Sequence, residues 1–356
     1  MNLTNFRTLG RSGLVVSPFA LGTMTFGTQR WGSDETVSEA VFNAYVDAGG
    51  NFIDTADIYS GGRSEELLGS YIENRRFRDQ IVLATKFTWH GGDPANVNGG
   101  GNGRKNIQRA LEGSLRRLRT DVIDLYWMHA WDMVTPVEEV LQSLGALQQS
   151  GKIRYFGFSD VPAWYAAKAA TFAADHAVPG PIALQLEYSL VERSIEREHV
   201  PAARECGLGI TPWSPLGGGF LAGKYARPDA GAGAAEKSNY QTGRLSGSNP
   251  FGDTKFTDRN WNTLDALRGV AAEIECPMAQ VALAWVSAQP GVSSPILGAS
   301  KPKQLKDNLA SLEIRLAPEQ LQVLDDSSAL DPVHPYLMFN QEVSQSIFGA
   351  SVQGWR

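Results

Sequence analysis

The sequence predicts an α/β protein that folds as a single (β/α)8 TIM barrel spanning residues 1–356. Three observations point to this class. Eight short, almost continuously apolar segments alternate with amphipathic helical patterns, as expected for parallel strands that are buried on both faces. No GxGxxG pattern follows any of these segments, which disfavours a doubly wound open sheet. Polar residues recur at the carboxyl ends of the segments, where barrel enzymes build their active sites.

The first element is expected to be a small hairpin over Phe6–Val16, with Gly10 and Gly13 near its turn. We expect this hairpin to cap the bottom of the barrel. The strands are expected at Phe19–Met24, Phe52–Ala56, Ile81–Lys86, Asp124–His129, Tyr155–Ser159, Ala183–Glu187, Gly209–Trp213 and Ser294–Gly298.

Helices are expected between the strands, because apolar residues recur there with the spacing of one helix face. The expected helices are Asp34–Ala48, Ser64–Glu73, Ile107–Leu118, Val137–Gln149, Trp164–Asp175, Ile195–Glu205, Trp261–Ile274 and Lys303–Leu312. Ser33 or Asp34 can cap the first of them.

Two segments interrupt this rhythm, Thr88–Gly103 and Arg227–Asn260, and both are rich in Gly, Asn, Ser and Asp. Both follow predicted strands, so we expect long loops on the C-terminal face, where such loops commonly act as lids. The tail over residues 331–356 carries the aromatic residues Tyr336, Phe339, Phe348 and Trp355. The tail is expected either to fold over the active site or to pack on the side of the barrel.

The composition excludes several classes of protein. The formal net charge is −6, whereas a protein that neutralises nucleic-acid phosphates should be basic. Two cysteines, Cys206 and Cys276, cannot build a disulfide scaffold or a multi-cysteine cluster, and no metal site is expected. No apolar run approaches the roughly 18 residues of a membrane span. The first residues contain no apolar export signal, so we expect a cytoplasmic protein without a nucleic-acid or membrane partner.

Four polar residues form the candidate catalytic group. Asp54, Lys86 and His129 end the second, third and fourth predicted strands, and Tyr59 follows Asp54 by five residues. A buried Lys and a buried Asp must pair, because each is costly alone. An ammonium near a phenol should lower the phenol pKa from about 10 and ease proton transfer. Each of these residues, taken alone, could serve only as a structural hydrogen-bonding group or a packing group. The four residues together suit protonation of a carbonyl oxygen coupled to delivery of a hydride.

With these residues in place, the sequence resembles the aldo-keto reductase superfamily over nearly its whole length. The matching segments are LGRSGLVVS (Leu9–Ser17), IDTADIY (Ile53–Tyr59), ATK (Ala84–Lys86), LYWMH (Leu125–His129), GKIRYFGFS (Gly151–Ser159), TPWSPLGGG (Thr211–Gly219) and LGAS-KP-QL-DN (Leu297–Asn308). The resemblance implies a (β/α)8 barrel and NAD(P)(H)-dependent interconversion of carbonyls and alcohols. It also implies a catalytic tetrad of Asp54, Tyr59, Lys86 and His129, with Tyr59 as general acid and base.

The resemblance further implies a cofactor site. Its residues would be Gly22, Thr23, Met24, Asp54, Ser159, Asp160, Gln185, Trp213, Ser214, Leu216, Lys224, Arg244, Gly298, Ser300, Lys301, Gln304 and Asn308. Ser159 and Gln185 would hold the nicotinamide carboxamide, and Trp213 would stack on the ring. Lys301 beside a predicted helix N-terminus suits a 2′-phosphate, which favours NADPH over NADH.

One position departs from the family pattern. The family commonly has Asn where this chain has Asp160. An ionised Asp can only accept hydrogen bonds, whereas Asn both donates and accepts. Asp160 could still accept from the carboxamide, or it could cap the helix that opens at Pro162.

The expected substrate pocket is aromatic, with Phe26, Trp31, Trp89 and Trp131 at the barrel mouth. It suits a small carbonyl compound, either flat and hydrophobic or a keto-sugar ring stacked on Trp. Two other functions are kept as alternatives. One is a sugar or alcohol dehydrogenase that runs in the oxidative direction, and the other is a cofactor-binding regulatory subunit similar to potassium-channel β-subunits. The sequence leaves the oligomeric state open.

Overall fold

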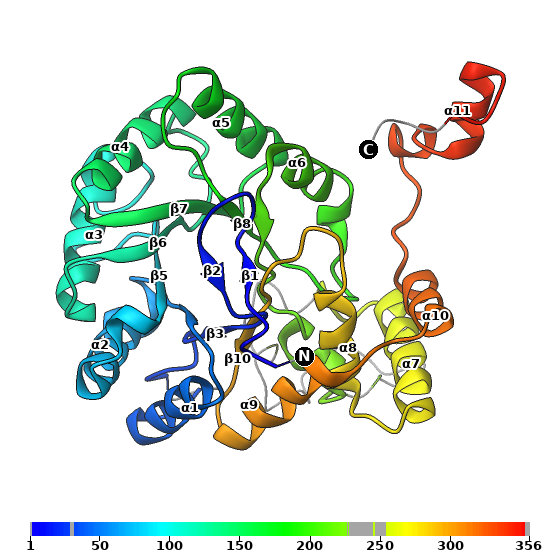
Figure 1. Cartoon of the computed structure of the whole chain (residues 1–356), viewed down its shortest axis with the longest axis horizontal. Coiled ribbons are helices and arrows are strands. Elements are labelled where there is room, and N and C mark those ends of the chain that lie inside the picture. Colours follow the sequence, from blue (N-terminus) through cyan, green and yellow to red (C-terminus); the bar gives the residue numbers. More distant parts are fainter. Residues whose placement is uncertain (1, 29–31, 226, 228–244, 246–253, 353–356) are drawn as a thin grey trace.

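The computed structural model describes residues 2–28, 32–225, 227, 245 and 254–352. Eight parallel strands form one sheet in the order β10-β3-β4-β5-β6-β7-β8-β9, and helices surround it (Figure 1). The strands are β3 (Ala20–Gly22), β4 (Phe52–Asp54), β5 (Val82–Phe87), β6 (Ile123–Met128), β7 (Ile153–Ser159), β8 (Ala183–Gln185), β9 (Gly209–Ile210) and β10 (Ile296–Gly298).

The sheet closes on itself between its two outermost strands. Ser293 N donates to Ile210 O over 2.8 Å, and Ile296 N donates to Pro212 O over 2.8 Å. These bonds join the β9 segment to the β10 segment, so the sheet is a closed cylinder. The predicted (β/α)8 barrel is therefore confirmed, and each predicted strand overlaps an observed one.

The helices of the described chain are more numerous than predicted. They are α1 (Glu35–Asp47), α2 (Arg63–Arg75), α3 (Arg104–Leu118), α4 (Val137–Gln149), α5 (Ala163–Asp175), α6 (His199–Cys206), α7 (Asp258–Glu273), α8 (Met278–Ser287), α9 (Pro302–Leu309), α10 (Pro318–Ser328) and α11 (Gln341–Phe348). Asp34 caps α1 by accepting from Val37 N over 2.9 Å. The helix predicted to begin at Ile195 begins instead at His199, after a short 3-10 turn. In the described part of the chain, none of these helices has the length and apolar character of a membrane span.

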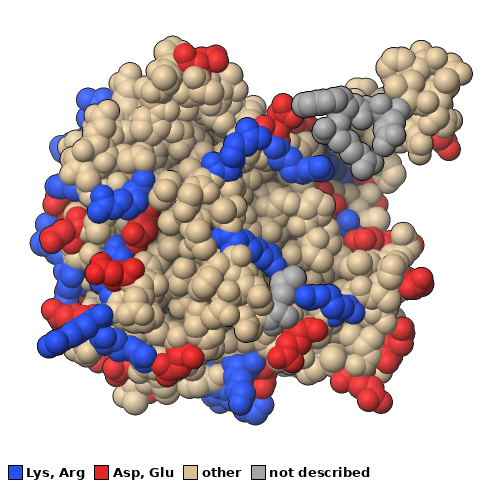
Figure 2. Space-filling view, in the orientation of Figure 1, with Lys and Arg blue, Asp and Glu red and all other residues tan. Residues whose placement is uncertain are grey.

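The predicted hairpin is confirmed, and it seals the bottom of the barrel. Its strands β1 (Arg7–Thr8) and β2 (Val15–Val16) are antiparallel and lie across the barrel centre in Figure 1. Gly10 at the turn has φ +62°, and a Cβ there would lie 2.4 Å from Ile182 O and 2.6 Å from Gly209 N. The turn therefore fits against the strand starts only as glycine. On this face, positive and negative side chains are interspersed around the periphery (Figure 2).

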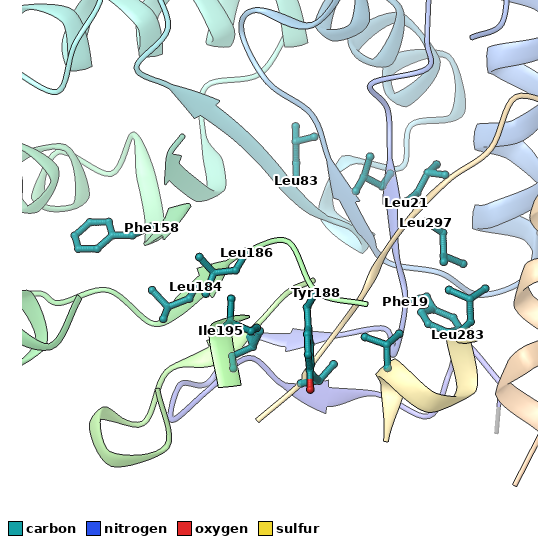
Figure 3. Close-up of a cluster of buried hydrophobic side chains, with 14 of the residues drawn as sticks. Phe19, Leu21, Leu83, Phe158, Leu184, Leu186, Tyr188, Ile195, Leu283 and Leu297 are labelled. Atoms are coloured by element: carbon teal, nitrogen blue, oxygen red, sulfur yellow. The ribbon is translucent and has the colours of Figure 1, made fainter. Parts of the chain in front are cut away.

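Residues alternate between the inside and the outside of the barrel along each strand. The inside contains an apolar layer that the hairpin residues Leu9 and Val16 complete, and its strand members are Ala20, Phe52, Val82, Ala84, Leu125, Trp127, Ala183 and Ile296. The outward residues pack beneath the helices, and Figure 3 shows several of them, including Leu21, Leu83, Phe158, Leu184 and Leu297. The inner layer is thus a plug below the strand ends.

The two loop predictions have different outcomes. The Thr88–Gly103 loop joins β5 to α3 on the C-terminal side, and Asn102 anchors it through Thr88 Oγ1 (2.6 Å) and Ala130 O (2.9 Å). Most of Arg227–Asn260 lies outside the described residues. In the tail, α11 lies beyond the ring of helices in Figure 1, and its Phe348 is 63% exposed. The described part of the tail therefore does not cover the strand ends.

Candidate active site

The alternation along the strands brings the predicted polar residues together. Asp54, Lys86 and Gln185 each lie two residues beyond an inward apolar residue, so their side chains also point into the barrel. Asp54 follows Phe52, Lys86 follows Ala84, and Gln185 follows Ala183. At the top of the barrel, Asp54 Oδ1 accepts from Gln185 Nε2 over 3.0 Å, which links β4 to β8 across the cylinder.

Lys86 is the centre of the site and is completely buried. Its Nζ donates to Asp54 Oδ2 (2.5 Å), to Thr55 O (2.8 Å) and to Tyr59 Oη (3.1 Å). All three ammonium hydrogens thereby have acceptors. Burial alone would lower the pKa of Lys86, but the attraction of Asp54 and Tyr59 outweighs burial and raises that pKa. The side chain is therefore a fixed positive charge beside the Tyr59 oxygen.

The Tyr59 side chain is held by an unusual turn. Ser60, Gly61 and Gly62 all have positive φ values, of 51°, 66° and 95°. Ser60 Oγ donates to Phe26 O over 2.9 Å and so ties this turn to the loop after β3. Glycine accepts such angles without strain, whereas Ser60 needs this anchoring bond.

His129 lies beside Tyr59, with ring centroids 5.9 Å apart and planes at 80°. Burial, and secondly the Lys86 charge, lower the pKa of His129 well below its usual range. The imidazole is therefore neutral near pH 7, and one of its nitrogens carries a hydrogen. Its Nδ1 is buried and has no hydrogen-bond partner among the described residues.

Asp160 follows β7 directly and takes a left-handed backbone angle, φ +44°. Its Oδ1 accepts from Trp213 Nε1 over 3.1 Å. Its side chain does not cap α5, whose N-cap position is Pro162, so that expectation was wrong. Asp160 is solvent-exposed, but surrounding protein atoms partly desolvate it, and this raises its pKa to about 6.

Residues with positive φ cluster in the backbone around Ser214, Leu216 and Lys224, which the resemblance places along the cofactor pyrophosphate. Ser214, Gly217, Gly218 and Gly219 all have positive φ, between 53° and 96°. A Cβ at Gly219 would lie 3.9 Å from Lys224 Nζ, so the ammonium is close to this backbone. Two amide groups of this turn are bonded within it, because Gly217 N donates to Ser214 O over 2.8 Å and Gly219 N donates to Leu216 O over 3.0 Å. Leu216 is half-buried within the same turn.

A second positively charged side chain, after Lys224, lies where β10 meets α9. Lys301 is exposed at the N-cap of α9, and Gln304 Oε1 accepts from Ser300 N over 3.0 Å. Asn308 Nδ2 is buried without a hydrogen-bond partner in the described part of the chain. The N-cap position of Lys301 agrees with the helix N-terminus that the sequence predicts beside this lysine.

The remaining predicted cofactor residues lie at the strand ends between these regions. Thr23 Oγ1 donates to Asp54 O over 3.2 Å, and Gly22 pairs with Asp54 in the strand register. A Cβ at Gly22 would lie 2.5 Å from Ile296 Cγ2, so only glycine fits. Ser159 is buried, Met24 is half-buried, and Gly298 is exposed. Arg244 lies outside the described residues.

The predicted pocket residues are not equivalent. Trp89 is 50% exposed, and its ring centroid lies 6.1 Å from that of His129. Trp131 is half-buried and packs edge-on against Trp164, with centroids 5.6 Å apart. Phe26 is completely buried and packs against the core, so the structure corrects its prediction as a pocket wall. Trp31 lies outside the described residues.

The sequence did not predict a buried ion pair that lies near the site. Lys255, 3% exposed, lies 2.9 Å from Glu187 and 3.5 Å from Glu192. Glu187 lies two residues after Gln185, so the same alternation indicates it, whereas nothing in the sequence indicates Lys255.

Comparisons with known proteins agree with this geometry. A sequence model of the aldo/keto reductase family matches residues 18–329. An uncharacterized oxidoreductase of Bacillus subtilis is 36% identical, over 89% of this chain and 94% of the relative. A probable voltage-gated potassium channel subunit beta of Oryza sativa is 35% identical, over 90% and 95%. A probable aryl-alcohol dehydrogenase of Saccharomyces cerevisiae is 34% identical, over 83% and 88%.

Proposed function

The chain belongs to the aldo/keto reductase family of NAD(P)H-dependent oxidoreductases, and we propose that it reduces an aldehyde or ketone to the alcohol with NADPH. The observation that carries this proposal is the position of Lys86 Nζ. It touches the Asp54 carboxylate and the Tyr59 hydroxyl at the same time, at the end of a closed barrel. This arrangement is suited to passing one proton to a substrate oxygen.

In the proposed mechanism, Tyr59 Oη donates its proton to the carbonyl oxygen. The Lys86 ammonium, 3.1 Å away, stabilises the phenolate that remains. Asp54 keeps Lys86 charged in its buried position. Neutral His129 can donate a hydrogen bond to the same substrate oxygen and orient it. The bound nicotinamide cofactor supplies the hydride to the carbonyl carbon, so that carbon and oxygen each gain one hydrogen.

Residues of this chain would hold the cofactor along the strand ends. Ser159 and Gln185 would bind the carboxamide, and Trp213 would stack on the ring. The pyrophosphate would be lined by Ser214, Leu216 and Lys224. Lys301 at the N-terminus of α9 would bind a 2′-phosphate, which supports NADPH over NADH.

The first test measures NADPH oxidation with an activated aromatic aldehyde such as a nitrobenzaldehyde. Tyr59→Phe should lower kcat by about 100-fold or more, because general acid catalysis contributes about 10²–10⁴-fold. Binding of NADPH, followed by quenching of tryptophan fluorescence, should be unchanged. Tyr336→Phe, which removes a hydroxyl on the exposed tail, is the matched control. Unchanged turnover in Tyr59→Phe would refute the role of Tyr59.

The choice of cofactor is tested separately at Lys301. Lys301→Met should weaken NADPH binding about tenfold and leave NADH binding nearly unchanged, because only NADPH carries the 2′-phosphate. An equal loss for both cofactors would contradict this assignment.

The proposed substrate is a flat aromatic carbonyl compound rather than a keto-sugar. Trp89 offers an exposed aromatic face next to His129, and one relative is named an aryl-alcohol dehydrogenase. A second candidate function is a cofactor-binding regulatory subunit, because another relative is named a potassium channel subunit. Tight NADPH binding without turnover on a broad panel of carbonyls and alcohols would favour that candidate.

A further inference from the structure

Asp160 connects three parts of the site. Its backbone N donates to Gln185 O over 3.2 Å, and its carbonyl accepts from Trp131 N over 3.2 Å. Its side-chain Oδ1 accepts from Trp213 Nε1 over 3.1 Å. The carboxylate is therefore fixed at the edge of the indole on which the nicotinamide is proposed to stack.

Among the residues that the structure describes, the charged side chains that face Asp160 are each paired with an opposite charge, whereas Asp160 is not. Lys86 faces it from β5 but is paired with Asp54, and Glu187 faces it from the segment after β8 but is paired with Lys255. Asp160 itself forms no ion pair in the described part of the chain. Its only side-chain donor there is the neutral indole N–H of Trp213. An ionised Asp160 thus leaves a net negative charge beside the proposed ring site.

The two redox forms of the cofactor respond differently to such a charge. The oxidised nicotinamide ring carries a positive charge, and the reduced ring is neutral. A nearby carboxylate therefore attracts only the oxidised form. We propose that Asp160 positions Trp213 and, through its negative charge, makes this site bind NADP+ in preference to NADPH. The inference rests on the proposed function, because it needs the nicotinamide to stack on Trp213.

This preference would assist reduction of a carbonyl. NADPH becomes NADP+ when it gives up a hydride, so a site that stabilises NADP+ makes the bound NADPH a stronger hydride donor. The effect also depends on pH. The pKa of Asp160 is raised to about 6, so the charge is present at pH 7.5 and is lost as the pH falls through about 6.

Asp160→Asn tests the charge alone. Asn keeps an oxygen that can accept from Trp213 and tolerates a positive φ, so the fold should be retained. Dissociation constants for NADP+ and NADPH are measured by quenching of tryptophan fluorescence, and circular dichroism checks the fold. At pH 7.5 the ratio Kd(NADP+)/Kd(NADPH) should rise about tenfold in the variant, the size expected for one unit charge in a partly hydrated site. In the unsubstituted protein, the same ratio should rise when the pH is lowered from 7.5 to 5.5, whereas in the variant it should not.

Asp265→Asn is the matched control, because it removes an exposed carboxylate on α7 that is paired with Arg268. Its ratio should equal that of the unsubstituted protein. An unchanged ratio in Asp160→Asn, or an equal weakening of both cofactors, would overturn the inference. If the unsubstituted protein binds neither cofactor, the proposed function itself fails, and this outcome is distinct from an unchanged ratio.

Discussion

The buried pair of Asp54 and Lys86 should be strongly coupled in the free energy of unfolding. The two side chains are 2% and 0% exposed, and Nζ lies 2.5 Å from Oδ2. Removal of one partner leaves an uncompensated buried charge, which typically costs about 3–5 kcal/mol. Removal of both partners leaves no charge, so the double variant should lose much less than the sum of the two single variants.

The assay is a double-mutant cycle with Asp54→Asn and Lys86→Met, measured by urea unfolding. Asn and Met keep the approximate size of each side chain while removing its charge. We expect each single variant to be destabilised by about 3 kcal/mol or more, and a coupling energy of about 2–3 kcal/mol. The pair Lys303–Asp307 is the matched control, because it has the same residue types at 2.7 Å but is 85% and 52% exposed. Its coupling should be about 0.3–0.5 kcal/mol.

Additive losses in the cycle of Asp54 and Lys86 would refute this reasoning. Additivity would mean that the buried pair contributes no more than an exposed one. In that case Asp54 would not hold the buried Lys86 in its charged form, and the proposed stabilisation of the Tyr59 phenolate would lose its physical basis.

Three further predictions concern Asp57, the hairpin turn at Gly10, and Trp89. Burial, and secondly Glu65, raise the pKa of Asp57 to about 7, so the folded protein binds this proton more tightly than the unfolded chain does. The free energy of unfolding should therefore fall as the pH rises from about 4 to 7. Urea unfolding at pH 5 and pH 8 should show a smaller fall in Asp57→Asn than in the unsubstituted protein. Gly10→Ala should lower stability by more than about 2 kcal/mol, because its Cβ would meet backbone atoms 2.4 Å away, and an unchanged Tm would contradict this. Trp89→Ala should raise KM for an aromatic aldehyde more than for a small aliphatic one, and equal changes would exclude Trp89 from the pocket.

Much of the fold and of the site could be predicted because two simple signals coincide. Buried parallel strands appear as short apolar runs, and functional side chains follow the inward residues at the strand ends. Helix α8 was not predicted because six of its ten residues, Val281–Val286, are buried in one continuous run, so the sequence shows no helical alternation of apolar and polar residues. Helix α10 was not predicted because too few of its side chains are buried to give an apolar stripe: among them only Leu324 and Ser328 are buried.

Contacts between distant segments could not be predicted in the same way. Glu187 and Lys255 are 68 residues apart in the sequence, and their pairing depends on how a long connection returns to the barrel. The sequence predicts Phe26 in the aromatic pocket, and this residue follows the predicted strand Phe19–Met24 by two positions. Beyond the end of a strand, however, the alternation no longer fixes the direction of a side chain, and Phe26 turned into the core.

The apolar plug below the site bears on its electrostatics. Along the inward rows, Phe52 precedes Asp54 and Ala84 precedes Lys86, so the ion pair rests on the apolar side chains of this layer. Such a layer keeps the local dielectric low from below, and a low dielectric strengthens the attraction between Lys86 and its two oxygen partners. The hairpin that seals the opposite end of the barrel completes this layer with Leu9 and Val16. A change at the bottom of the barrel that admits water should therefore weaken the pairing of Lys86 at the top.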